Sequence, residues 1–109
     1  MTLTEKEVEN SILQYLSLLK NCMAWKNQSI GIYDPIKKIF RRSNNKYHIN
    51  GVSDILGIYK GRALAIEVKS KTGRATEAQV EFLTQFEAMG GVAILARSVA
   101  DVVVALGKL

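Results

Sequence analysis

The sequence predicts an α/β domain in which a mixed sheet is flanked by helices. Three observations carry this prediction: an amphipathic helix near the start, two β-rich runs joined by a two-residue turn, and a strand, helix and strand unit near the end. A hairpin followed by a β-α-β crossover contains both antiparallel and parallel strands. Helices must then cover the apolar faces of the sheet, which gives a layered architecture.

The first helix is predicted from Thr4 to Lys20. Apolar residues recur there at three- and four-residue steps, as on the buried face of a helix. Thr4 and Glu7 have the spacing of a capping box, which marks the helix start. After this helix, the Asp34-Pro35 turn separates two short predicted strands, at residues 30–33 and 36–42.

Residues 52–59 and 62–69 form a predicted hairpin around Lys60-Gly61. With a two-residue turn, paired residue numbers sum to 121, so Asp54 faces Glu67. Lys69 lies on the same face, because side chains alternate along a strand. A three-residue turn would slip the register by one and exchange the faces.

The last third of the chain predicts a helix, a strand and a second helix. Thr76 opens the first helix with another capping box, to Gln79, and glycines at 90 and 91 end it. Residues 92–96 are a predicted buried strand, and Ser98 caps a final helix that runs to about residue 106. The apolar face of the first of these helices is expected to contain Phe82, Leu83, Phe86 and Met89.

The composition is that of one globular domain. The 109 residues suffice for one hydrophobic core but not for two, so residues 1–109 are expected to form a single domain. No apolar run approaches the roughly 20 residues that cross a bilayer, and the start of the chain does not resemble a signal peptide. The single cysteine excludes an internal disulfide. These features predict a cytoplasmic protein without a membrane partner or a small-molecule cofactor.

Two opposed acids on one hairpin face need compensation, because like charges at directly paired positions destabilise a sheet. The compensation is a raised carboxyl pKa, a salt bridge to Lys69, or a bound divalent cation. Mg²⁺ prefers oxygen ligands and commonly takes one or two carboxylates together with waters and substrate phosphates. A lysine beside such a pair can hold a water and offset charge on a phosphate in reaction. Asp54, Glu67 and Lys69 therefore outline a phosphodiesterase site.

These residues resemble the PD-(D/E)XK nuclease superfamily, and within it the virus-type replication-repair nuclease (VRR-NUC) domain. Residues 51–54 resemble its G-x-x-D motif, with Ser53 where Pro is usual, and residues 67–69 are similar to its E-x-K motif. The segment around Gln79 and the closing Gly-Gly, strand and helix are similar as well. The resemblance implies a restriction-endonuclease-like fold with an αβββαβα core and a mixed central sheet flanked by helices.

The resemblance also implies roles for individual residues. Asp54 and Glu67 would bind Mg²⁺ or Mn²⁺, the backbone carbonyl of Val68 is a further possible ligand, and Lys69 would position and activate the attacking water. Related nucleases take another acid from the first helix. Glu9 fits that position best and Glu5 is the fallback, while a structural charge near the helix start is the alternative. Gln79 would be a further catalytic residue, although its capping box explains it equally well.

The net charge of +5 favours a polyanionic partner. A stretch without acids carries most of the basic residues expected to grip DNA phosphates, and two more follow the E-x-K motif. The predicted DNA-binding residues are Lys37, Lys38, Arg41, Arg42, Lys46, Lys71 and Arg74. A solvated basic loop is the alternative for the first five.

The function expected from these features is a Mg²⁺- or Mn²⁺-dependent DNA endonuclease. Without a base-reading module, its selectivity should be for DNA shape, with four-way (Holliday) junctions or other branched DNA as substrates of a homodimer. A compact domain of this kind resembles phage or prophage proteins, which places it in a bacterial or infected-host cytoplasm. The alternatives are a catalytically inactive DNA-binding or scaffold module, and a nuclease for RNA or unbranched DNA.

Overall fold

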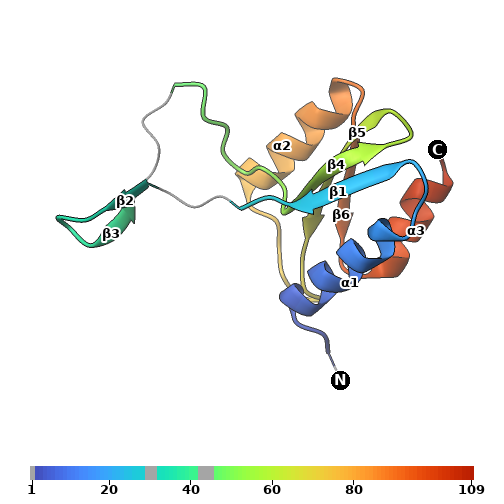
Figure 1. The fold of residues 1–109 in the computed structure, drawn as a ribbon, viewed down its shortest axis with the longest axis horizontal. Helices are drawn as coiled ribbons and strands as arrows, with labels where there is room; N and C mark the ends of the chain where they lie inside the picture. The colour runs from blue at the N-terminus through green and yellow to red at the C-terminus, as the bar shows by residue number, and fades with distance from the viewer. Residues whose placement is uncertain (1, 29–31, 42–45) are drawn as a thin grey trace.

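The computed structural model describes residues 2–28, 32–41 and 46–109. Figure 1 shows how its helices and strands are arranged. Their order is α1 (Glu5–Ser17), β1 (Cys22–Lys26), β2 (Ile32–Asp34), β3 (Ile39–Arg41), β4 (Ile55–Tyr59), β5 (Arg62–Val68), α2 (Glu77–Ala88), β6 (Val92–Ala96) and α3 (Val99–Gly107). Without β2 and β3, this is the expected αβββαβα order.

The central sheet has the strand order β1-β4-β5-β6. β1, β4 and β5 pair antiparallel, whereas β5 and β6 pair parallel across the connection that contains α2. The mixed sheet predicted from the sequence is therefore confirmed. β2 and β3 form a two-stranded sheet of their own, which stands apart from the central sheet (Figure 1).

The origin of the first core strand differs from the prediction. The predicted strands at 30–33 and 36–42 overlap β2 and β3, but these belong to the separate sheet, and residues 36–38 lie in the turn between them. The first core strand is β1, a segment with no predicted strand. The first helix is also shorter than predicted, because it ends at Ser17 with Leu18 as its C-cap. Arg42 lies outside the described residues, as does the start of the first predicted strand.

The predicted register of the β4–β5 hairpin is confirmed. Tyr59 pairs with Arg62 and Ile55 pairs with Ile66, so the residue numbers sum to 121. Lys60 and Gly61 both have positive φ angles, 48° and 79°, as a type I′ turn requires. This turn matches the right-handed twist of the strands, and it directs residues 54 and 67 to the same end of the hairpin.

The hydrophobic core lies between the sheet and the α1 and α3 helices. From the helices it contains Val8, Ile12, Leu16, Val102 and Leu106, and from the sheet chiefly Ile55, Tyr59, Leu64, Ile66, Val68, Ile94 and Ala96. Both predicted capping boxes are formed, Thr4 with Glu7 and Thr76 with Gln79. They fix where α1 and α2 begin.

The α2 helix covers the opposite face of the sheet, over β5 and β6 (Figure 1). None of its residues is fully buried. Met89, predicted on its inner face, is instead 87% exposed. The helix ends at Ala88, so Met89 lies at the C-cap and no longer follows the helical face.

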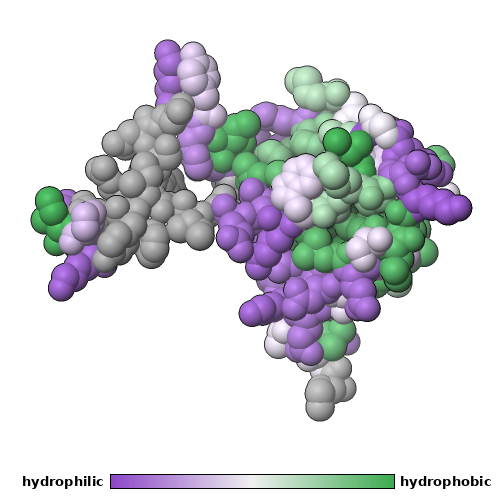
Figure 2. Space-filling model, viewed as in Figure 1, coloured by the Kyte–Doolittle hydropathy of each residue, from purple (hydrophilic) through white to green (hydrophobic). Residues whose placement is uncertain are grey.

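The same face of the sheet is less covered over β1 and β4. Met23, Trp25 and Ile58 point to this side, and they are 61%, 45% and 46% exposed. Figure 2 shows pale and green surface in this region. Among the described helices, none is long and apolar enough to cross a membrane.

Candidate active site

Asp54 is fixed at the end of the central sheet by bonds to both sides. Its carboxylate Oδ2 accepts a hydrogen bond of 2.9 Å from the backbone N–H of Val68 in β5. Its backbone carbonyl accepts a bond of 2.7 Å from the N–H of Asn27, directly after β1. The position of this acid is therefore set by the strand on each side of β4.

Glu67 is a buried acid whose charge is poorly compensated. The residue is 1% exposed, and neither carboxylate oxygen accepts a hydrogen bond from any described residue. The Lys69 ammonium nitrogen lies 3.9 Å from Glu67 Oε2, which is beyond hydrogen-bonding distance. Buried carboxylates normally receive such bonds, so Glu67 requires another explanation.

The environment of Glu67 favours its neutral form. Burial is the largest cause, and together with the Asp54 carboxylate it raises the pKa of Glu67 to about 9. Asp54 acts both as a hydrogen-bond acceptor for the protonated group and as a negative charge, and the Glu5 charge adds to the effect. The Lys69 charge opposes it. Of the compensations that the sequence left open, a raised pKa is thus present and a close salt bridge is not.

The donor set of this pair suits a hard divalent cation. Two carboxylates converge, and the buried one has two oxygens with no donor, which a cation would satisfy. The part of the chain that the structure describes contains no group of three His, Cys, Asp or Glu residues placed to hold a metal. Waters, a backbone carbonyl such as that of Val68, and substrate oxygens would therefore complete the coordination, as is usual for Mg²⁺.

The two candidate acids of the first helix lie in different surroundings. Glu9 is 6% exposed on the inner face of α1, and its Oε2 lies 3.0 Å from the ammonium nitrogen of Lys26 at the end of β1. Glu5 is exposed, but its charge is felt by Glu67. The structure thus gives Glu9 an ion-pair partner and places the Glu5 charge within electrostatic range of the acidic pair.

Gln79 lies in the first turn of α2 and serves the capping box. Its side-chain oxygen accepts a bond of 2.8 Å from the N–H of Thr76, which leaves its amide nitrogen for other contacts. Gly51, with a φ of +75°, packs directly on this turn: a Cβ there would lie 2.3 Å from the backbone carbonyl carbon of Ala78. The Gly51 position therefore lets the Asp54 segment approach the α2 backbone.

The predicted DNA-binding residues divide into two groups. Lys37 and Lys38 are exposed in the turn of the separate β2–β3 sheet, and Arg41 ends β3. Lys46 follows, with its ammonium group 5.1 Å from the centre of the Tyr47 ring. The second group, Lys71 and Arg74, is exposed directly after β5, close in sequence to Lys69.

Two features of the site were not predicted from the sequence: the contacts of Arg97 and the burial of Ser53. Arg97, between β6 and α3, bonds three carbonyls of the loop that follows Lys69. Only its place just before the Ser98 helix cap could have drawn attention to it. Ser53 is fully buried and its hydroxyl has no described partner. The Ser53 side chain thus fills space in the core, and its hydroxyl group makes no hydrogen bond to a described residue.

Comparison with known proteins agrees with this architecture. No protein-family model and no curated protein matches the chain. A solved structure described as a "VRR_NUC domain protein" is similar with a TM-score of 0.63 and 23% sequence identity, over 99% of this chain and 88% of the other. The chain has the fold of a VRR-NUC domain. This VRR-NUC fold is the one that the G-x-x-D and E-x-K motifs predicted.

Proposed function

We propose that this chain is a metal-dependent endonuclease that hydrolyses phosphodiester bonds in DNA. The observation that carries the proposal is the buried Glu67 carboxylate beside Asp54, with neither oxygen accepting a hydrogen bond from a described residue. A purely structural acid would be expected to have a donor. The VRR-NUC fold and the neighbouring Lys69 support nuclease chemistry at this position.

Asp54 and Glu67 are the proposed ligands of Mg²⁺ or Mn²⁺, with the Val68 carbonyl as a further ligand. When bound, the cation supplies Lewis-acid charge at the phosphate. Glu9 is the proposed helix acid, and Glu5 is its alternative because the Glu9 carboxylate is paired with Lys26. Substitutions described in the Discussion separate these two.

Lys69 is the proposed group that orients the attacking water. Its side chain is 12% exposed, and its ammonium nitrogen lies 3.9 Å from Glu67 Oε2. A fixed cation in a partly dehydrated site stabilises developing phosphate charge more strongly than one in water. The amide nitrogen of Gln79, which the capping box does not use, is a further proposed donor toward the same site.

Branched DNA and a homodimer remain part of the proposal. A small domain without a base-reading element has little surface for choosing a sequence, which favours recognition of DNA shape. The uncharged side chains exposed over β1 and β4, Met23, Trp25 and Ile58, offer a surface that a second copy would cover. Two copies related by a two-fold axis would present two sites to a symmetric junction.

The test is cleavage of labelled four-way junction, flap, linear duplex, single-stranded DNA and RNA with Mg²⁺, Mn²⁺ or EDTA. Wild type is compared with Asp54→Asn and Glu67→Gln, and with Glu87→Gln as a matched control at an exposed helix position. Loss of either site carboxylate should reduce the rate by at least about two orders of magnitude, because metal-ion catalysis contributes several kcal/mol. The control should cut like wild type.

The outcomes distinguish the candidate functions. Metal-dependent cleavage that both site variants lose supports the nuclease, and paired nicks confined to the junction support the dimeric, structure-selective form. If RNA or linear DNA is cleaved as fast as the four-way junction, that nucleic acid replaces branched DNA as the proposed substrate. If wild type binds DNA but cuts none of the substrates with either metal, the inactive DNA-binding module is the correct function. Sedimentation of wild type and Trp25→Glu tests the dimer separately.

A further inference from the structure

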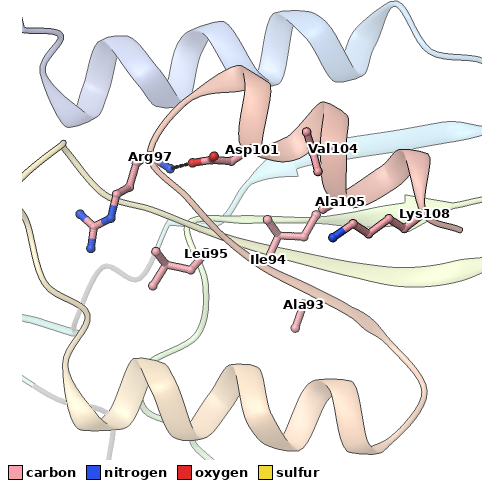
Figure 3. Close-up of a pocket in the computed structure, with 8 residues that line it drawn as sticks. All are labelled: Ala93, Ile94, Leu95, Arg97, Asp101, Val104, Ala105 and Lys108. Carbon is pink, nitrogen blue, oxygen red and sulfur yellow. Dashed lines mark hydrogen bonds between the residues drawn. The ribbon is translucent and has the colours of Figure 1, made fainter.

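The loop that follows Lys69 is held in place by Arg97, which directly follows the neighbouring strand β6. The Nη1 atom of Arg97 donates to the carbonyls of Ser70 at 2.7 Å and Gly73 at 2.6 Å, with a longer contact of 3.4 Å to Lys71. Figure 3 shows the Arg97 side chain extending away from α3, and its backbone N–H bonded to Asp101 at 2.8 Å. One guanidinium nitrogen therefore donates to three carbonyls of the loop.

The loop is also closed by bonds of its own. The Gly73 N–H donates to the Ser70 hydroxyl oxygen at 3.1 Å and to the Ser70 carbonyl at 3.3 Å. A Cβ on Gly73 would lie 3.7 Å from Cδ of Lys69, which is ordinary contact distance. Residues 70–73 thus fold back against the Lys69 stem, and the bonds to Arg97 keep them there.

The charges on this loop point outward. Lys71 and Arg74 are exposed, and Lys71 lines a hollow together with Arg97 and Ser98. Within the described residues no carboxylate lies within ion-pair distance of the Arg97 guanidinium. The loop therefore carries positive charges without ion-pair partners in the described part of the chain, on a fixed backbone directly beside Lys69. Such charges can bind the phosphates of a nucleic-acid backbone.

We propose that Arg97 is a positioning residue that shapes residues 70–74 into a contact for the DNA phosphates next to the scissile bond. This inference rests on the proposed function, because it assumes a nucleic-acid substrate at the Asp54 and Glu67 pair. Arg97 acts through the loop: it fixes where Lys71 and Arg74 stand relative to Lys69. Lysine at position 97 keeps the charge but not the planar donor group that reaches several carbonyls.

The experiment measures binding of a labelled four-way junction in EDTA, where metal-dependent cleavage is blocked, over a range of salt concentrations. The variants are Arg97→Met, Arg97→Lys, the double variant Lys71→Ala/Arg74→Ala, and the triple combination with Arg97→Met. Arg62→Met is the matched control, because Arg62 also donates to a backbone carbonyl, that of Gly90. It lies at the other end of β5, roughly 23 Å from Lys69 at 3.3 Å per residue.

Loss of two phosphate contacts should lower the salt slope by about two. Arg97→Met should lower the salt slope as much as the double variant Lys71→Ala/Arg74→Ala does. The triple variant should show no further decrease in the salt slope. Arg97→Lys should fall between Arg97→Met and wild type, while Arg62→Met binds like wild type. Additive losses in the triple variant would overturn the proposal, since Arg97 would then act independently of the loop. Unchanged binding by Arg97→Met would overturn it as well.

Hydrogen exchange in the free protein keeps the two proposals distinguishable. The amide of Gly73 should exchange faster in Arg97→Met but not in Arg62→Met, provided that circular dichroism shows both variants folded. If wild type binds no DNA or RNA, the proposed function fails, while faster exchange still supports the hold of Arg97 on the loop. Unchanged exchange would refute that hold whatever the substrate.

Discussion

Replacing Glu67 with Gln should remove a pH dependence of stability that the metal-free wild type shows. The pKa of Glu67 is raised from 4.5 to about 9 in the folded protein. Between these values the folded state holds one proton more than the unfolded state, so the free energy of unfolding decreases as pH rises. The stabilisation is fully present below pH 4.5 and is lost on passing pH 9.

The magnitude follows from the single proton. One proton difference changes the free energy of unfolding by at most about 1.4 kcal/mol per pH unit, hence by about 3 kcal/mol at most between pH 6 and pH 8. Glutamine cannot ionise, so Glu67→Gln should lack this decrease. Other groups titrate alike in both proteins, and the difference between the two curves isolates Glu67.

The assay is urea denaturation at several pH values from 6 to 9 in EDTA, with Glu87→Gln as the matched exposed control. Repeating it with Mg²⁺ should stabilise wild type increasingly as pH rises, by about 3 kcal/mol at a concentration 100 times the dissociation constant, because the cation binds the ionised carboxylate. Glu67→Gln should gain much less. Parallel pH curves for wild type and Glu67→Gln in EDTA would refute the reasoning.

Substitutions at Gly51, Lys26 and Ser53, with their controls, test the surroundings of the site. Gly51→Ala and Gly61→Ala both place a side chain at positive φ, but only residue 51 meets backbone, at 2.3 Å. Denaturation should show a loss of about 1 kcal/mol for Gly61→Ala and clearly more for Gly51→Ala, and equal losses would refute the contact with α2. Lys26→Met should cost about 1 to 3 kcal/mol by leaving Glu9 unpaired. Glu9→Gln should restore the stability of Lys26→Met. As the proposed helix acid, Glu9 should also be needed for full metal-induced stabilisation, so Glu9→Gln should weaken it and Glu5→Gln should not; the reverse result would assign the role to Glu5. Ser53→Ala should be neutral or stabilise by up to about 1 kcal/mol, since it removes a buried hydroxyl that has no partner among the described residues. A clear loss of stability in thermal denaturation would reveal a partner.

Local signals predicted much of the fold. The two capping boxes, the two-residue turn at Lys60-Gly61 and the register derived from it depend on residues close in sequence, and all are present. β1 was missed because it is stabilised by pairing with β4, whose paired residues come 29 to 37 positions later, and because its sequence does not alternate between apolar and polar residues. Met23 and Trp25 within it are largely exposed.

The same distinction applies to the site. The opposed pair of Asp54 and Glu67 follows from the hairpin register, so it was predictable. The partner of Glu9 was not, because Lys26 lies on the missed strand. Arg97 approaches the loop after Lys69 through the register of the parallel pairing of β5 with β6, and the sequence predicted this pairing but not its register. The features of the site that were not predicted therefore depend on contacts between segments that are distant in the sequence.

The β2–β3 sheet lies within an insertion whose two ends are neighbours. The chain leaves the central sheet at Lys26 and returns at Ile55, and these two residues are paired across β1 and β4. The entropic cost of closing a loop rises only slowly with its length. The segment that precedes the Gly51 turn could therefore lengthen, shorten or be exchanged between homologues at little expense to the core. Evolution, or an engineer, could alter the basic segment at residues 37–46 while leaving the acids and their supporting strands intact.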